Sequence, residues 1–98
     1  MSAQNADICG TTTITKSNTT EITFTNNHPS SCTANDNGTS MSLSQLIGES
    51  SITVPARSGS TPGTLTKTIL TGAALGTYSW ARPTCCGPER VNPQIILQ

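Results

Sequence analysis

The chain contains few charged residues and few aromatic residues. Charged side chains make up 10% of its 98 residues, aromatic side chains make up 3%, and the formal net charge is zero. The basic residues are scattered, at Lys16, Arg57, Lys67, Arg82 and Arg90. Scattered cations do not form the basic stripe with which proteins follow a phosphate backbone. The sequence therefore predicts no nucleic-acid partner.

Long hydrophobic runs are also missing. No stretch approaches the roughly 20 apolar residues that a membrane span needs. The first ten residues lack the basic start and the apolar run of a signal peptide. Hydrophobic residues make up only 33% of the chain, and a domain of this size buries a limited part of its surface. We therefore expect a thin core and no membrane span, with an export route that the first residues do not reveal.

The residues needed for catalysis or metal binding are sparse. The single histidine, His28, lies in the segment NNHPSS beside several serines, but no strained nucleophile turn or rigid orienting carboxylate is indicated. The cysteines lack the Cys-x2-Cys spacing of zinc sites, and one histidine is too few for a blue-copper centre. The sequence predicts no enzyme activity, no catalytic residue, no metal and no cofactor.

Serine, threonine and asparagine dominate the polar residues, and apolar and polar residues alternate in several short segments. β-Branched side chains at period two are typical of half-exposed strands. The expected strands lie in 11–16, 21–26, 41–47, 51–56, 64–71, 72–81 and 91–98, with a helical turn as the alternative for 41–47 and a loop at 26–38. About seven short strands predict an all-β, antiparallel two-sheet sandwich. We expect one domain over residues 1–98, with 1–8 as a flexible N-terminal arm.

The segment LTGAALGTYSW, residues 70–80, resembles the tyrosine corner of immunoglobulin-like and related Greek-key sandwiches. The resemblance implies that the Tyr78 hydroxyl bonds to the backbone of the preceding corner. It also implies that Leu70 or Leu75 caps the core and that Trp80 points inward, where antibody domains place a cysteine. It concerns the fold and implies no function.

The four cysteines, Cys9, Cys32, Cys85 and Cys86, allow three pairings. A bond between adjacent Cys85 and Cys86 closes a strained ring, so the two pairings that tie this couple to both Cys9 and Cys32 are favoured. Each bridge adds roughly 2 to 4 kcal/mol to a small domain. Any of these bonds could instead cross to a neighbouring chain. The use of cysteine predicts an extracellular, cell-surface or spore-surface location.

Two functional hypotheses follow. The first is a non-enzymatic structural subunit of a surface filament, coat or appendage, in which the four cysteines lock subunits and the apolar end QIILQ pairs with a neighbour's sheet edge. The chain is similar in this respect to the disulfide-linked jelly-roll subunits of spore appendages. The second is a secreted effector, toxin or inhibitor that offers its 81–90 loop to a protein partner, with Arg82, Glu89 and Arg90 as contacts.

Overall fold

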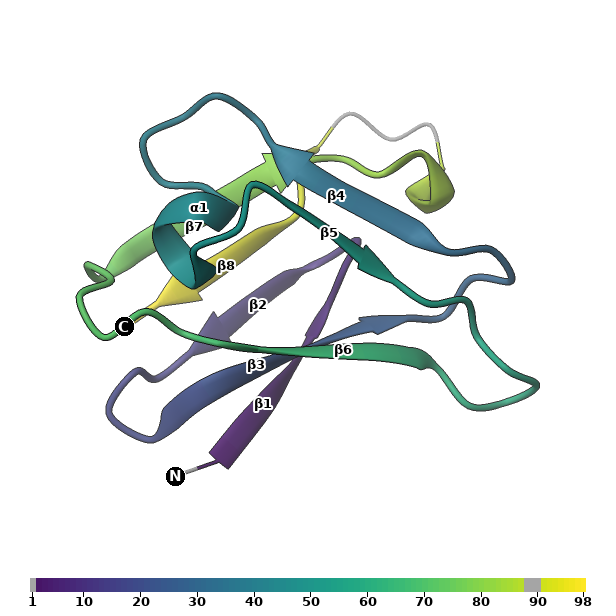
Figure 1. Ribbon diagram of the computed structural model, residues 1–98, viewed down its shortest axis with the longest axis horizontal. Helices are drawn as coiled ribbons and strands as arrows, with labels where there is room; N and C mark the ends of the chain where they lie inside the picture. The colour runs from purple at the N-terminus through teal and green to yellow at the C-terminus, as the bar shows by residue number, and fades with distance from the viewer. Residues whose placement is uncertain (1, 88–90) are drawn as a thin grey trace.

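The computed structural model describes residues 2–87 and 91–98 (Figure 1). Over these residues the chain forms strands in two sheets, one short α-helix and one 3-10 turn. In chain order the elements are β1 (Ser2–Asp7), β2 (Thr11–Ile14), β3 (Thr19–Asn26), β4 (Cys32–Asp36), α1 (Leu43–Ile47), β5 (Ser51–Val54), β6 (Gly63–Thr68), β7 (Gly76–Ala81), η1 (Thr84–Cys86) and β8 (Gln94–Leu97). Sheet I has the order β1-β3-β6, and sheet II has the order β2-β8-β7-β4-β5.

Both sheets are mixed. β1 runs parallel to β3 and β2 runs parallel to β8, whereas the other neighbouring strands are antiparallel. The predicted β-rich fold with disulfides is confirmed, but the prediction of purely antiparallel sheets is wrong. The reason lies in the connections, because β1 and β2 follow each other in sequence and belong to different sheets. Strands that pass between sheets need not form hairpins.

Most of the segment expected as a flexible arm, residues 1–8, forms an edge strand instead. Residues Ser2–Asp7 form β1, and Ala6 pairs with Phe24 in the ladder with β3. Ala6 and Ile8 are buried. The sequence SAQNAD gives no hydrophobic alternation, so its pairing depends on the partner strand rather than on its own pattern.

Two further elements differ from the expected segments. The expected loop at 26–38 contains β4, whose Cys32 and Ala34 are buried while Thr33 and Asn35 are exposed. The residues that alternate in β4 are small or polar, so the composition of this strand resembles that of a loop. In 41–47 the helical alternative is the one that forms.

The helix α1 begins with a capping box in which Ser42 and Gln45 bond reciprocally to each other's backbone, and it ends at Gly48 with φ of 79°. Asp36 accepts hydrogen bonds from the hydroxyl and backbone N–H of Ser44. Burial raises the pKa of Asp36, but these hydrogen bonds outweigh it and the net pKa is lowered. The helix is therefore anchored to the end of β4.

Buried side chains from both sheets form one cluster. Its largest members are Trp80, Tyr78 and Phe24, and the rings of Phe24 in β3 and Trp80 in β7 meet edge to face with centroids 5.8 Å apart. The Trp80 indole N–H donates to the carbonyl oxygen of Ile8, at 3.2 Å. This contact links sheet II to the turn that follows β1.

The segment before β7 has the expected hydrogen bond but a different core cap. The Tyr78 hydroxyl donates to the carbonyl oxygen of Ala74. Leu70 and Leu75 do not cap the core, because their exposed fractions are 41% and 62%. Ile69 and Ala73 are buried instead. The positions of the leucines in the sequence did not indicate that the residues near them, rather than the leucines themselves, face the core.

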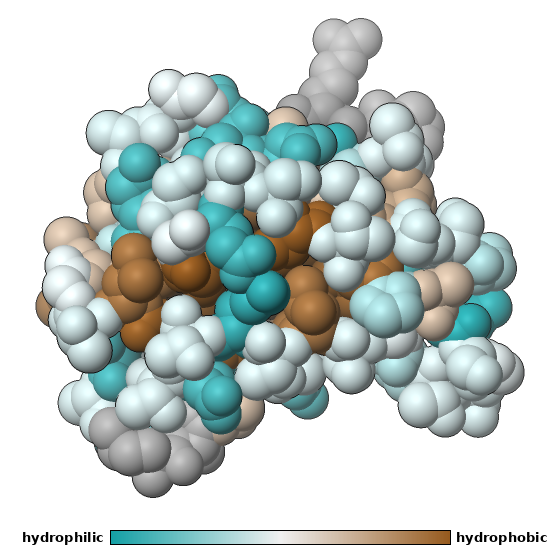
Figure 2. All heavy atoms as spheres, viewed as in Figure 1, coloured by the Kyte–Doolittle hydropathy of each residue, from teal (hydrophilic) through white to brown (hydrophobic). Residues whose placement is uncertain are grey.

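Most of the surface in Figure 2 is polar, with a hydrophobic band between the α1 and β5 side of sheet II and β6 of sheet I. A groove of about 530 Å³ is lined by Ile47, Ile69 and Leu70 together with the polar residues Glu49, Thr66, Lys67, Thr68 and Thr71. Glu49 forms an ion pair with Lys67 of β6, at 2.7 Å. Within the described ranges, no helix has the length and hydrophobicity to cross a membrane.

Candidate functional site

The two disulfides meet at one end of the molecule. Cys9 pairs with Cys86 and Cys32 pairs with Cys85, with Cα atoms 5.5 and 5.6 Å apart. This is one of the two favoured pairings, so the 85–86 couple is tied to both distant cysteines. All four cysteines are consumed within the chain. Such bonds persist in a non-reducing environment.

The disulfides brace residues 81–87, from the last residue of β7 onward, and we define this segment as the stapled loop. Arg82 lies at its start and donates to the carbonyl oxygens of Cys86 at 2.6 Å, Val91 at 3.1 Å and Cys9 at 3.4 Å. Pro83 is buried, whereas Thr84 and Gly87 are exposed. The loop is therefore held both covalently and by a guanidinium, with its tip open to solvent.

The three residues predicted as partner contacts have different outcomes in the structure. Arg82 is half-buried and bonds to the backbone of its own chain, so its guanidinium organises the stapled loop. Glu89 and Arg90 lie outside the described residues. Thr84, which the sequence did not single out, is the exposed side chain at the start of η1.

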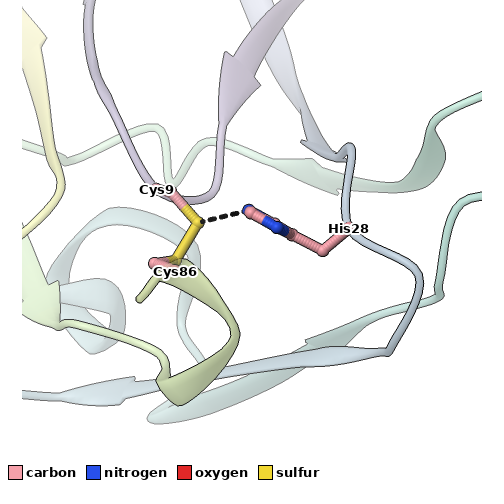
Figure 3. A group of neighbouring side chains, drawn as sticks. All are labelled: Cys9, His28 and Cys86. Atoms are coloured by element: carbon pink, nitrogen blue, oxygen red, sulfur yellow. Dashed lines mark hydrogen bonds between the residues drawn. A yellow bond between two sulfur atoms is a disulfide. The ribbon is translucent and has the colours of Figure 1, made fainter. Parts of the chain in front are cut away.

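His28 lies beside the first disulfide (Figure 3). Its Nε2 is 3.5 Å from the Sγ of Cys9. The surrounding loop is fixed by Asn26, a fully buried residue whose Oδ1 accepts a hydrogen bond from the His28 backbone N–H at 2.9 Å. The His28 carbonyl oxygen accepts a hydrogen bond from the Arg57 backbone N–H. A lone histidine in a polar loop gave no sequence signal for this contact.

The sulfur atoms of the two bridges are also neighbours. The Sγ atoms of Cys85 and Cys86 lie 3.7 Å apart. We call Cys9, His28, Cys32, Cys85 and Cys86 the sulfur cluster.

The ligand atoms of Cys9, His28 and Cys86 lie within 4.8 Å of one another, a grouping compatible in size with a metal site. Metal binding by cysteine requires the thiolate, and here the two sulfurs are bonded to each other. In the disulfide form this group therefore offers an imidazole and no thiolate.

Comparison of the chain with protein families, with curated proteins and with solved structures gave no match.

Proposed function

We propose that the protein is an exported, non-enzymatic binding protein that presents the stapled loop to a protein partner. The observation that carries this proposal is the convergence of both disulfides and the Arg82 hydrogen bonds on residues 81–87. A loop ordered before binding loses little conformational entropy when a partner docks, which improves affinity. An effector, toxin or inhibitor uses such a loop as its contact surface.

The fold proposed with this function is a sandwich of immunoglobulin-like or jelly-roll type. The contact between Phe24 of sheet I and Trp80 of sheet II supports it, as does the shared buried cluster. A rigid two-sheet body is a suitable support for a loop that carries exposed contact residues. The non-reducing environment that disulfides require is supplied outside the cell or at its surface.

A self-assembling structural subunit is the second candidate. A zero net charge, and the apolar residues Ile47, Ile69 and Leu70 in the groove beside Lys67, favour association between copies. Two observations weaken this candidate. The cysteines assigned to bonds between subunits pair within the chain, and β8, which contains most of QIILQ, is bonded on both sides by β2 and β7. A strand with both neighbours in place has no free edge for another chain.

Two measurements distinguish the candidates. Light scattering under native conditions is expected to show a monomer for the binding protein and polymers for the structural subunit. A Thr84→Arg variant places a long cation on the exposed tip of the stapled loop. It should prevent capture of the partner from the extracellular fraction of the producing organism.

The matched control is Ser17→Arg, in the turn between β2 and β3 at the other end of the molecule (Figure 1). It adds the same charge to another exposed position and should leave capture unchanged. A protein retained equally by both variants does not use the stapled loop. Polymers in the native material would remove the binding proposal in favour of the structural subunit.

A further inference from the structure

The two disulfides have different surroundings. Cys32 is 1% exposed, so one end of the Cys32–Cys85 bond is shielded by the core. Cys9 and Cys86 are both half-buried, and only Cys9 has the imidazole of His28 against its sulfur, at 3.5 Å. Exchange of a disulfide depends on access to the attacked sulfur and on the stability of the departing thiolate. Cys85 is half-buried like Cys86, so an attacking thiol has similar access to these two sulfurs. The departing thiolate distinguishes the bonds, because Cys9 lies beside His28 whereas Cys32 lies in the core, and it favours reaction at the Cys9–Cys86 bond.

We propose that the Cys9–Cys86 bond is a thiol-exchange site for small-molecule thiols, with Cys86 as the attacked residue and Cys9 as the leaving group. A thiolate R–S⁻ forms a bond to the Sγ of Cys86, and the bond between the Sγ atoms of Cys9 and Cys86 breaks. The electron pair of that bond goes to the Cys9 sulfur. The products are the mixed disulfide R–S–S–Cys86 and the Cys9 thiolate, so charge and electrons balance.

His28 is a positioning residue that sets the direction of this exchange. With a proton on Nε2, His28 donates to the Cys9 sulfur, and a hydrogen-bond donor beside a thiolate stabilises the charged form. Its place is held by Asn26, which accepts a hydrogen bond from the His28 backbone, and by the bond from Arg57 to the His28 carbonyl oxygen. The negative charge that forms as the bond breaks therefore falls on the Cys9 sulfur, which lies beside His28 (Figure 3).

The direction of attack decides whether the second bridge survives. Attack on Cys9 would free Cys86, whose sulfur lies 3.7 Å from that of Cys85 and could go on to open the Cys32–Cys85 bond. Attack on Cys86 leaves Cys86 capped and the free thiolate on Cys9, beside His28. The second bridge then stays closed while the stapled loop carries the added group. This site goes beyond the proposed binding function and does not depend on it.

The test uses the folded, oxidised protein and reduced glutathione near neutral pH. Free thiols are trapped with N-ethylmaleimide, and peptides from an acid digest are read by tandem mass spectrometry. Glutathione is expected on Cys86 and maleimide on Cys9, with Cys32–Cys85 intact. His28→Gln, which keeps a polar side chain and removes the imidazole, should slow exchange at Cys86 by roughly three- to tenfold. A second variant, His28→Phe, should give the same result.

The Cys32–Cys85 bond is the internal reference in each sample. A loop merely loosened by the His28 substitutions would speed exchange at both bonds, and exchange through global unfolding would label both bonds equally. Either result overturns the proposal, as does glutathione found first on Cys9. A folded protein carrying one surface cysteine, reduced and run in parallel, is expected to react more slowly at the half-buried bond. Faster reaction with that protein would overturn the assignment to small thiols.

Discussion

At the scale of single residues, the structure depends on a few polar side chains whose partners are distant in sequence. Asn26 is fully buried, and its Nδ2 donates toward the carbonyl oxygens of Ser30 at 3.0 Å and Pro55 at 3.1 Å. Its Oδ1 accepts from the backbone N–H of His28. One side chain thus joins the loop after β3 to the segment after β5.

Replacing Asn26 with alanine is expected to lower the free energy of unfolding by about 2 to 4 kcal/mol, because buried backbone groups are left without partners. Urea unfolding measures the change. The matched control is Asn35→Ala, at an exposed position of β4, which should change stability by about 0.5 kcal/mol or less. Equal effects of the two substitutions would contradict the role assigned to Asn26.

Tyr78 allows a direct titration, because it is the only tyrosine in the chain. Burial raises the pKa of its hydroxyl above the ordinary value near 10. The folded protein therefore keeps this proton at a pH where the unfolded chain has lost it. Stability linked to Tyr78 is complete below about pH 10 and is lost as pH rises through the raised pKa.

Phenolate absorbance of the folded protein is expected to appear at higher pH than that of the same chain unfolded in guanidinium. Tyr78→Phe should cost about 1 kcal/mol at neutral pH through the lost bond to Ala74, and should reduce the fall in stability at high pH. A folded-state titration at or below the unfolded one would show that burial does not control this hydroxyl.

At the scale of elements, the decisive contacts are those between segments that leave one sheet and enter the other. β6 begins at the buried residue Gly63, directly against the backbone of Pro55 and Ala56, which follow β5. A side chain at position 63 would overlap the carbonyl oxygen of Pro55. The crossing from sheet II to sheet I therefore requires a residue without Cβ at this point.

Gly63→Ala is expected to destabilise the protein by about 3 kcal/mol or more, because the overlap involves backbone atoms that cannot rotate away. Gly72→Ala is the control, since a Cβ at Gly72 meets no atom within 4 Å and its change should stay within about 0.5 kcal/mol. Thermal unfolding compares the pair. Similar midpoints for both variants would mean that β6 can shift away from Pro55.

The strands and their connections also explain which parts of the fold the sequence could predict and which it could not. Alternation found the strands that carry Ile22 and Phe24, Ile52 and Val54, because β-branched and aromatic residues mark a half-buried face. β1 and β4 were missed, since alanine and cysteine provide their buried positions. The meeting of His28 with Cys9 was not predictable, because it depends on how the loops after β1 and β3 pack. Period-two patterns describe strands and contain no information on which sheet each strand joins.

At the scale of the whole molecule, stability is divided between a thin core and two covalent links. The bridges join residues separated by 77 and 53 positions, and in the chain-entropy description loops of this size are worth about 4 kcal/mol each. A domain of this length has a net stability of about 5 to 15 kcal/mol. The two links together are therefore comparable with the whole free energy of unfolding.

By chain entropy alone, the Cys9–Cys86 bridge should stabilise the fold slightly more than the Cys32–Cys85 bridge, because it closes the longer loop. Core packing reverses that order, since Cys32 is 1% exposed and its removal leaves a cavity. We expect Cys32→Ala with Cys85→Ala to be less stable than Cys9→Ala with Cys86→Ala in urea unfolding. Restoring volume with Cys32→Val in place of Cys32→Ala should recover part of the difference. If loss of the Cys9–Cys86 bridge proves the more destabilising, or if valine recovers nothing, then core packing at Cys32 does not set the order of the two bridges.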